Sequence, residues 1–170
     1  MISTDKNSFG KHPVTADEHT IQLSAEAEQV LQGFRLEDIP SHLLRRAHFL
    51  AEDMFSKEFS TEALTPRQKA TLLVVAQHPG LKQSELAQKL RMDRNTIADM
   101  VKRLCANGML VRRPAADDQR AYQLHIADKG IEMLNLVLPR DAKVEQQLLD
   151  KLPEEYRSLF IKCLKMIVGS

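Results

Sequence analysis

The stretch from residue 83 to residue 107 constrains the fold more than any other part of the sequence. Two short segments carry apolar residues at helical spacing, at about 83–90 and 93–107, and only Arg91 and Met92 separate them. Asp93 suits the N-cap of the second segment, and Gly108 suits the position just after its end. Two helices joined by so short a turn predict a helix-turn-helix.

Two short apolar segments follow this helix pair. "MLVRRP" and "AYQLHIA" have the composition of strands, and the loop "AADDQ" between them contains residue types that favour turns. They predict a β-hairpin. A hairpin directly after a helix-turn-helix is the arrangement of a winged helix.

Positive charge is concentrated in the same region, although the formal net charge of the 170 residues is only +1. Residues 89–113 contain seven basic residues (Lys and Arg) and two acidic ones (Asp and Glu). Residues 1–39 contain three basic residues and seven acidic ones. A local basic patch is the electrostatic signature of docking onto nucleic acid. Because no long apolar run or secretory signal occurs, we expect a cytoplasmic protein without a membrane partner.

Apolar residues at helical spacing also flank the winged domain on both sides. One pattern runs from about 42 to 59, and we expect Ser41 to cap it. The last pattern begins at Pro153-Glu154 and keeps a single apolar face. In the segment before it, we expect one helix to end at Pro139 and another to resume. These helices offer more apolar surface than one winged domain covers, so we expect a homodimer.

The expected fold class is therefore mainly α with a small β-hairpin wing. We assign residues 63–130 to a winged helix-turn-helix DNA-binding domain, which begins with a helix that Thr65 caps and Pro66 opens. Residues 36–62 and 131–170 form the expected helical dimerisation region, and residues 1–35 a flexible N-terminal leader.

The second helix of the pair divides into two faces when each residue is advanced by 100°. Ile97, Met100, Val101 and Leu104 form the expected buried stripe. The opposite half carries the candidate DNA contacts. Arg94 and Asn95 lie in the first turn, where base edges are read, Lys102 and Arg103 suit phosphates, and Thr96 suits either a cap or a phosphate.

Asp99 shares the cationic face, where its charge opposes the phosphates. It could accept a hydrogen bond from a cytosine amino group, or it could orient Arg103 four residues further on. We favour the orienting role.

The hairpin adds further candidates. Arg113 opens it beside Arg112, and Arg120 closes its loop, where Asp117 or Asp118 can hold the arginine outward. An arginine at a hairpin tip can enter the narrow, negative minor groove of A·T-rich DNA. The alternative is that the aspartates are present only because they suit turns.

"GLKQSELAQKLRMDRNTIADMVKRLCANGMLVRRPAADDQRAYQLHIADKG" closely resembles the DNA-binding core of MarR-type regulators. The family has a Leu-Ala pair, met by Leu86-Ala87, and the pattern R-x-P-x-x-x-D-x-R in its wing. Arg112 or Arg113, Pro114, Asp118 and Arg120 meet that wing pattern. The resemblance implies homodimers that mainly repress, bound to a pseudo-palindromic operator in double-stranded DNA, with Arg120 in the minor groove braced by Asp118. Ala127 departs from the helix-capping Thr frequent in the family.

The resemblance also implies an effector, because family members often bind small molecules between the dimer helices and the winged domain. The candidate ligand-binding residues are Ser41, His42, Arg45, Arg46, His48 and Phe49. Arginine beside aromatic and hydroxyl groups suits a carboxylate on an aromatic ring. This stretch resembles family members that respond to aromatic acids or their CoA thioesters. The alternative is that both arginines form salt bridges and the histidines are exposed.

Three other functions compete with this interpretation. A redox-responsive regulator of the same fold would need a reactive thiol, but Cys105 and Cys163 occupy the apolar sides of helices. A winged module that binds only proteins would not need the basic face. No phosphate loop, catalytic grouping or metal cluster occurs, so we expect neither an enzyme nor a cofactor.

Overall fold

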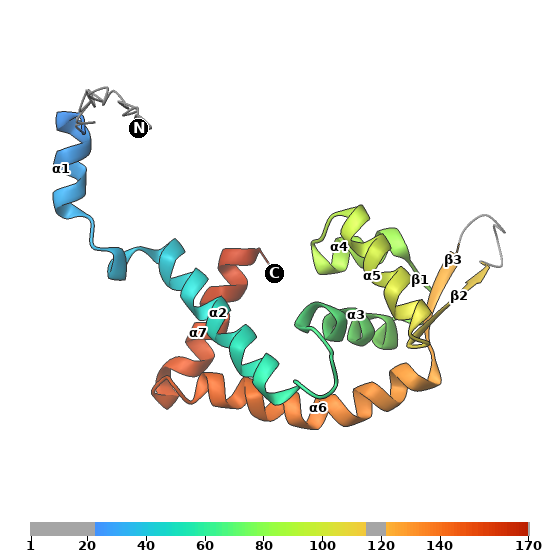
Figure 1. Cartoon of the computed structure of the whole chain (residues 1–170). Coiled ribbons are helices and arrows are strands. Elements are labelled where there is room, and N and C mark those ends of the chain that lie inside the picture. The colour runs from blue at the N-terminus through green and yellow to red at the C-terminus, as the bar shows by residue number, and fades with distance from the viewer. Residues whose placement is uncertain (1–22, 115–121, 170) are drawn as a thin grey trace, which may run out of the picture. The chain divides into compact units, whose positions relative to one another are not determined.

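The computed structural model describes residues 23–114 and 122–169 (Figure 1). The helices are α1 (Ala25–Gly33), the 3-10 turn Leu36–Asp38, α2 (Pro40–Glu58), α3 (Pro66–Gln77), α4 (Gln83–Leu90), α5 (Arg94–Ala106), α6 (Asp128–Leu149) and α7 (Glu154–Val168). The strands are β1 (Leu81–Lys82), β2 (Leu110–Pro114) and β3 (Tyr122–Ile126). The chain divides between Leu43 and Leu44 into two compact units.

The larger unit contains the expected winged helix. The helix pair α4 and α5 leads into the antiparallel hairpin of β2 and β3, as Figure 1 shows. The mainly helical fold class with a small β element is therefore confirmed. The strand β1 is not predicted by the sequence pattern. Its Leu81 pairs with Leu124 of β3 and completes a three-stranded sheet in the order β1-β3-β2. A strand of two residues is too short to produce an alternating pattern.

Local signals begin and end these helices as expected. The Thr65 side chain accepts a hydrogen bond from the Gln68 backbone, and the Gln68 side chain accepts one from the Thr65 backbone, which makes a capping box at the start of α3. Gly108 follows α5 with a φ of 74°, in the left-handed region that glycine occupies readily. Ala127 provides no side-chain cap for α6, as its apolar side chain implies.

Two expectations about helix boundaries are wrong. α2 begins at Pro40, so Ser41 is its second residue and not its cap. Proline fits the first turn because its fixed φ is helical and its missing N–H needs no partner there. α6 continues through Pro139 as one helix. Proline removes one backbone hydrogen bond, but Leu134 and Val137 before it and Val144 after it are all buried, and this packing holds both halves in one helix.

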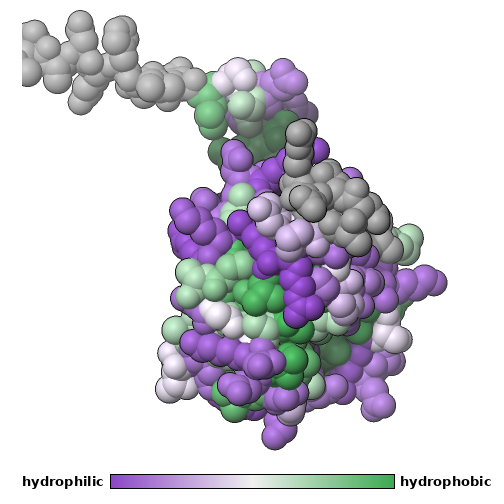
Figure 2. Space-filling model, turned by 90° about the vertical axis from the view of Figure 1, so that its right-hand side faces the viewer, coloured by the Kyte–Doolittle hydropathy of each residue, from purple (hydrophilic) through white to green (hydrophobic). Residues whose placement is uncertain are grey.

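The core of the larger unit is formed by residues of α3, α4, α5, β2, β3 and α6, together with Phe59 just after α2. Its fully buried side chains are Phe59, Thr71, Leu72, Val75, Leu86, Ile97, Val101, Leu104, Leu110, Leu124 and Val137. Gly130 lets the first turn of α6 approach the sheet, because a Cβ there would lie 2.2 Å from the Met109 carbonyl oxygen. On the face shown in Figure 2, hydrophobic patches interrupt a largely hydrophilic surface.

α6 is also tied to the end of α2 and the following loop by one arginine. Arg140 pairs with Glu58, 2.7 Å from its carboxylate, and with Glu62, and its guanidinium lies 4.8 Å from the centre of the Phe59 ring. The hydrogen bond from Arg140, and a second from Thr61, hold the pKa of Glu62 below its ordinary value. This cluster fixes the loop that leads into α3.

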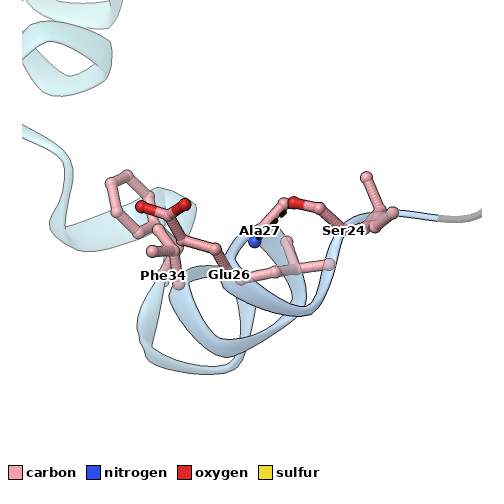
Figure 3. Close-up of a pocket in the computed structure, with 7 residues that line it drawn as sticks. Ser24, Glu26, Ala27 and Phe34 are labelled. Carbon is pink, nitrogen blue, oxygen red and sulfur yellow. Dashed lines mark hydrogen bonds between the residues drawn. The ribbon is translucent and has the colours of Figure 1, made fainter.

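Among its described residues, the smaller unit contains the amphipathic helix α1, the 3-10 turn Leu36–Asp38 and the first residues of α2. Ser24 caps α1 by accepting a hydrogen bond from the Ala27 backbone N–H, drawn as a dashed line in Figure 3. A shallow hollow of about 550 Å³ lies against this segment, lined among others by Leu23, Val30 and Phe34. All of the residues that line this hollow lie in 23–34, so it is an open depression on a single segment and not a binding cavity.

Candidate nucleic-acid interface

α5 is the element that would present side chains to a nucleic acid, and its start is fixed by one aspartate. Asp93 accepts a hydrogen bond from the Thr96 backbone N–H at 2.9 Å and another from the Thr96 hydroxyl at 2.5 Å. These bonds, the hydroxyl's first, lower the pKa of the Asp93 carboxyl below its ordinary value. Thr96 thus donates to the cap that Asp93 provides, and its expected phosphate contact stays a prediction.

The inner face of α5 anchors the helix in the domain. Ile97, Val101 and Leu104 are fully buried and Met100 is nearly so, which confirms the expected stripe. At about 1.5–3 kcal/mol for each fully buried side chain, this stripe fixes the rotation of the helix about its axis. The opposite face is therefore held outward.

The outer face of α5 is cationic and available. Arg94, Asn95, Lys102 and Arg103 are all exposed. Within residues 23–114 and 122–169, none of the four side chains makes a hydrogen bond or an ion pair. Three unpaired cations and an amide on one side of a helix are suited to phosphates and base edges in a major groove.

Asp99 does not behave as expected. It is exposed, and in the described part of the chain it forms no ion pair with Arg103, so the orienting role is wrong in this structure. Both residues line a hollow of about 260 Å³ between α5 and the first turn of α3, together with Arg67 and Gln68. The sequence pattern does not indicate this part of α3, because its closeness to α5 depends on tertiary packing.

The hairpin carries the next candidates. Arg113 is exposed on β2 opposite Gln123, whereas Arg112 donates a hydrogen bond to the Gln83 side chain of α4 at 3.3 Å. Arg112 is thus partly engaged in joining the wing to the helix pair, whereas Arg113 makes no side-chain hydrogen bond or ion pair with the described residues. Asp118 and Arg120, the expected minor-groove pair, lie outside the described residues.

A separate cavity of about 310 Å³, open to solvent, lies in the larger unit between α2, α3, α6, the end of α4 and the turn before α5. It is lined by His48, Ala51, Glu52, Phe55, Pro66, Arg67, Lys69, Ala70, Leu90, Met92 and Glu145. His48 is the only one of the six predicted ligand-binding residues among them. Its imidazole lies 3.5 Å from the carboxylate of Glu52.

The other predicted ligand-binding residues lie elsewhere. Arg45, Arg46 and Phe49 are exposed on α2, with the Phe49 ring 6.0 Å from that of His48. Ser41 and His42 belong to the smaller unit. Instead, the structure brings Lys69 and Phe55 to the cavity, and no local sequence pattern connects them, because α3 and α2 meet only in the folded chain.

Comparison with known proteins gives this geometry its context. The sequence profile of the MarR family matches residues 64–121, which include α3, α4, α5 and β2. The crystal structure of MarR is 31% identical and covers 78% of this chain and 90% of its own, with a TM-score of 0.67. The chain belongs to the MarR family.

Two further solved members are similar over most of the chain. The transcriptional repressor CouR, bound to a 23-mer DNA duplex, is 28% identical with a TM-score of 0.69, covering 78% of this chain and 94% of its own. The PcaV regulator of Streptomyces coelicolor, in complex with its natural ligand, is 26% identical with a TM-score of 0.75, covering 81% and 96%. This MarR-family chain is thus a transcriptional regulator, and the expectation that it is not an enzyme agrees with these relatives.

The two cysteines of this MarR-family chain are both free and lie in different surroundings. Cys105 is partly buried at the edge of the α5 stripe, and burial raises the pKa of its thiol, which lowers the reactive thiolate fraction. Cys163 is exposed on α7 and is not the core residue that its apolar position suggested.

Two kinds of feature are absent from the described ranges. No helix there combines the length and the apolar character needed to cross a lipid bilayer. No three His, Cys, Asp or Glu side chains there are grouped as metal ligands.

Proposed function

We propose that this protein is a homodimeric, sequence-specific repressor that leaves its operator when a small aromatic carboxylate, or the CoA thioester of one, binds. The observation that carries DNA binding is the outer face of α5, whose Arg94, Asn95, Lys102 and Arg103 are exposed and unpaired within the described ranges. In this proposal Arg94 and Asn95 read base edges, and Lys102 and Arg103 bind phosphates. Arg113 contacts the backbone from the wing, where Asp118 and Arg120 complete the interface.

Dimerisation is supported by the apolar side chains that the single chain leaves uncovered. Tyr156, Leu159 and Ile167, all on one side of α7, are each more than half exposed. Contiguous exposed apolar surface of this kind marks a protein–protein interface. Residues 36–62 and 131–170 would form the dimerisation region around the winged domain at 63–130, and two copies would place two recognition helices on a pseudo-palindromic site.

The cavity between α2, α3 and α6 supports the effector. Its volume of about 310 Å³ matches the lower end of the range for small-molecule sites, enough for one substituted ring. Lys69 and Arg67 provide positive charge and Phe55 an aromatic surface. His48 lies at the same cavity, and the remaining predicted ligand residues (Ser41, His42, Arg45, Arg46 and Phe49) stay proposed contacts. A CoA portion would extend outside the cavity.

Selection from a pool of random DNA duplexes tests the DNA-binding part of the proposal. We expect enrichment of a pseudo-palindromic site, with affinity that falls steeply as salt rises because bound phosphates release counterions. Arg94→Ala should weaken binding to that site by about 1–3 kcal/mol and reduce sequence preference, measured by fluorescence anisotropy.

Lys143→Ala is the matched control, because it removes an exposed cation of α6 outside the α5 face. Equal losses in the two variants would mean that Arg94 supplies only general charge. Binding that ignores salt and enriches no sequence would overturn the DNA-binding function and favour a module that contacts proteins.

A further inference from the structure

The ammonium group of Lys69 has two carboxylate neighbours on α6, and it contacts one of them much more closely than the other. Lys69 Nζ lies 2.8 Å from both oxygens of Asp141, and the two side chains are only 15% and 12% exposed. The same nitrogen lies 3.8 Å from Glu145, whose side chain is 61% exposed. Asp141 is therefore a fixed partner, while Glu145 is a loose one that water can reach.

The hydrogen-bonding capacity of Lys69 leaves room for another anion. An ammonium group has three N–H donors, and the two oxygens of Asp141 accept two of them. Glu145 lies beyond hydrogen-bonding distance, so it attracts the charge without accepting the third proton. Lys69 and Glu145 both line the effector cavity, and the ammonium also lies 5.0 Å from the centre of the Phe55 ring.

An aromatic acid in this cavity would place its ring beside Phe55 and its carboxylate near Lys69. That position is already under the influence of Glu145, whose charge has the same sign as the incoming carboxylate. Two carboxylates cannot both approach one ammonium that Asp141 already neutralises without repelling each other. Glu145 can relieve this repulsion because it is exposed and can swing into water, whereas the buried Asp141 cannot.

We propose that Lys69 is the anion anchor of the effector cavity and that Glu145 is a built-in competitor whose carboxylate lies beside the effector carboxylate's place when the cavity is empty. This inference rests on the proposed function, because it assigns regulation to the same cavity. Glu145 sets the effector concentration at which the repressor responds. It also selects against weakly held anions, since any acid must overcome the repulsion of the Glu145 carboxylate to bind Lys69.

Isothermal titration of the full chain with 4-hydroxybenzoate tests the competition. Glu145→Gln removes the competing charge at nearly constant volume, and we expect about tenfold tighter binding. The neutral amide 4-hydroxybenzamide should bind the wild type and Glu145→Gln equally, because it brings no charge into conflict with Glu145. Glu132→Gln, an exposed carboxylate elsewhere on α6, is the matched control and should leave both affinities unchanged.

Lys69→Met should weaken 4-hydroxybenzoate binding about tenfold or more, and a thermal melt checks that the variant folds despite leaving Asp141 unpaired. If Lys69→Met does not fold, Glu145→Gln decides alone. Wild-type binding that Glu145→Gln does not tighten would overturn the competitor role and leave the proposed function standing. Absence of 4-hydroxybenzoate binding in both the wild type and Glu145→Gln would overturn this inference and the aromatic-acid effector together, while the DNA selection still judges the DNA-binding function.

Discussion

Helices α5 and α7 have the same kind of sequence but opposite surroundings in the single chain. Each is amphipathic, with a continuous apolar stripe on one side. The stripe of α5 is covered by its own domain, with Ile97, Val101 and Leu104 fully buried. α7 has no buried residue, and Leu159 and Ile167 on its stripe are 52% and 65% exposed.

The difference shows what an amphipathic pattern establishes and what it leaves open. Periodicity identifies the face of a helix that must be covered, but not the element that covers it. For α5 the covering elements lie in the same chain, so the larger unit buries this stripe without a partner subunit. For α7 we propose that a second subunit covers the stripe. In that case α7 belongs to the dimer interface, and α5 belongs to the surface that contacts DNA.

The largest expected effect comes from breaking the buried stripe. Leu104→Ala should lower the free energy of unfolding by about 2–5 kcal/mol, because it removes buried methyl groups and leaves a cavity in the core. Urea denaturation at fixed protein concentration measures this loss. Leu159→Ala, the same change on the exposed stripe of α7, is the matched comparison and should cost less. Equal losses in the two variants would contradict the contrast between the helices.

A charge on the stripe of α7 should act on assembly and not on the fold of the winged unit. Leu159→Asp should weaken the dimer about tenfold or more, equivalent to at least about 1.4 kcal/mol, because an unpaired carboxylate would enter an apolar interface. Analytical ultracentrifugation over a dilution series measures the dissociation constant.

Ser158→Asp provides the control, since it places the same charge on the exposed opposite side of α7. A dimer that Leu159→Asp and Ser158→Asp weaken equally would mean that net charge, and not the apolar stripe, governs association. A dimer that neither variant weakens would remove α7 from the interface.

The sequence predicted best those features that depend on neighbouring residues. The cap at Thr65, the cap at Asp93 and the stop at Gly108 each depend on a few adjacent positions, and all are found in the structure. The same kind of local rule fails at Pro139, because packing along α6 outweighs one lost hydrogen bond.

The cavity could not be predicted in the same way. Lys69 and Asp141 are 72 positions apart, and each has an ordinary local context. The predicted set on α2 shares one helix face by spacing alone, and only His48 reaches the cavity. Side chains that meet through tertiary packing leave no periodic signal, and this also explains why the place of Asp99 beside the first turn of α3 was missed.

The smallest expected effect concerns the start of α5, which Asp93 caps and for which α7 has no side-chain equivalent. Because the pKa of Asp93 is lowered in the folded state, its carboxylate stabilises the fold fully above the ordinary aspartate pKa of about 3.9, and this contribution is lost as the pH falls through the lower folded pKa. Asn is also a good N-cap, so Asp93→Asn should change stability little at neutral pH. The wild type should therefore lose stability relative to Asp93→Asn only below about pH 4, and urea denaturation repeated at decreasing pH measures this difference.

Asp99→Asn is the control, because it removes a carboxylate of the same helix that accepts no hydrogen bond within the described ranges. It should follow the wild-type pH profile. If both variants depart from the wild type alike, general charge and not the cap determines the acid sensitivity of α5.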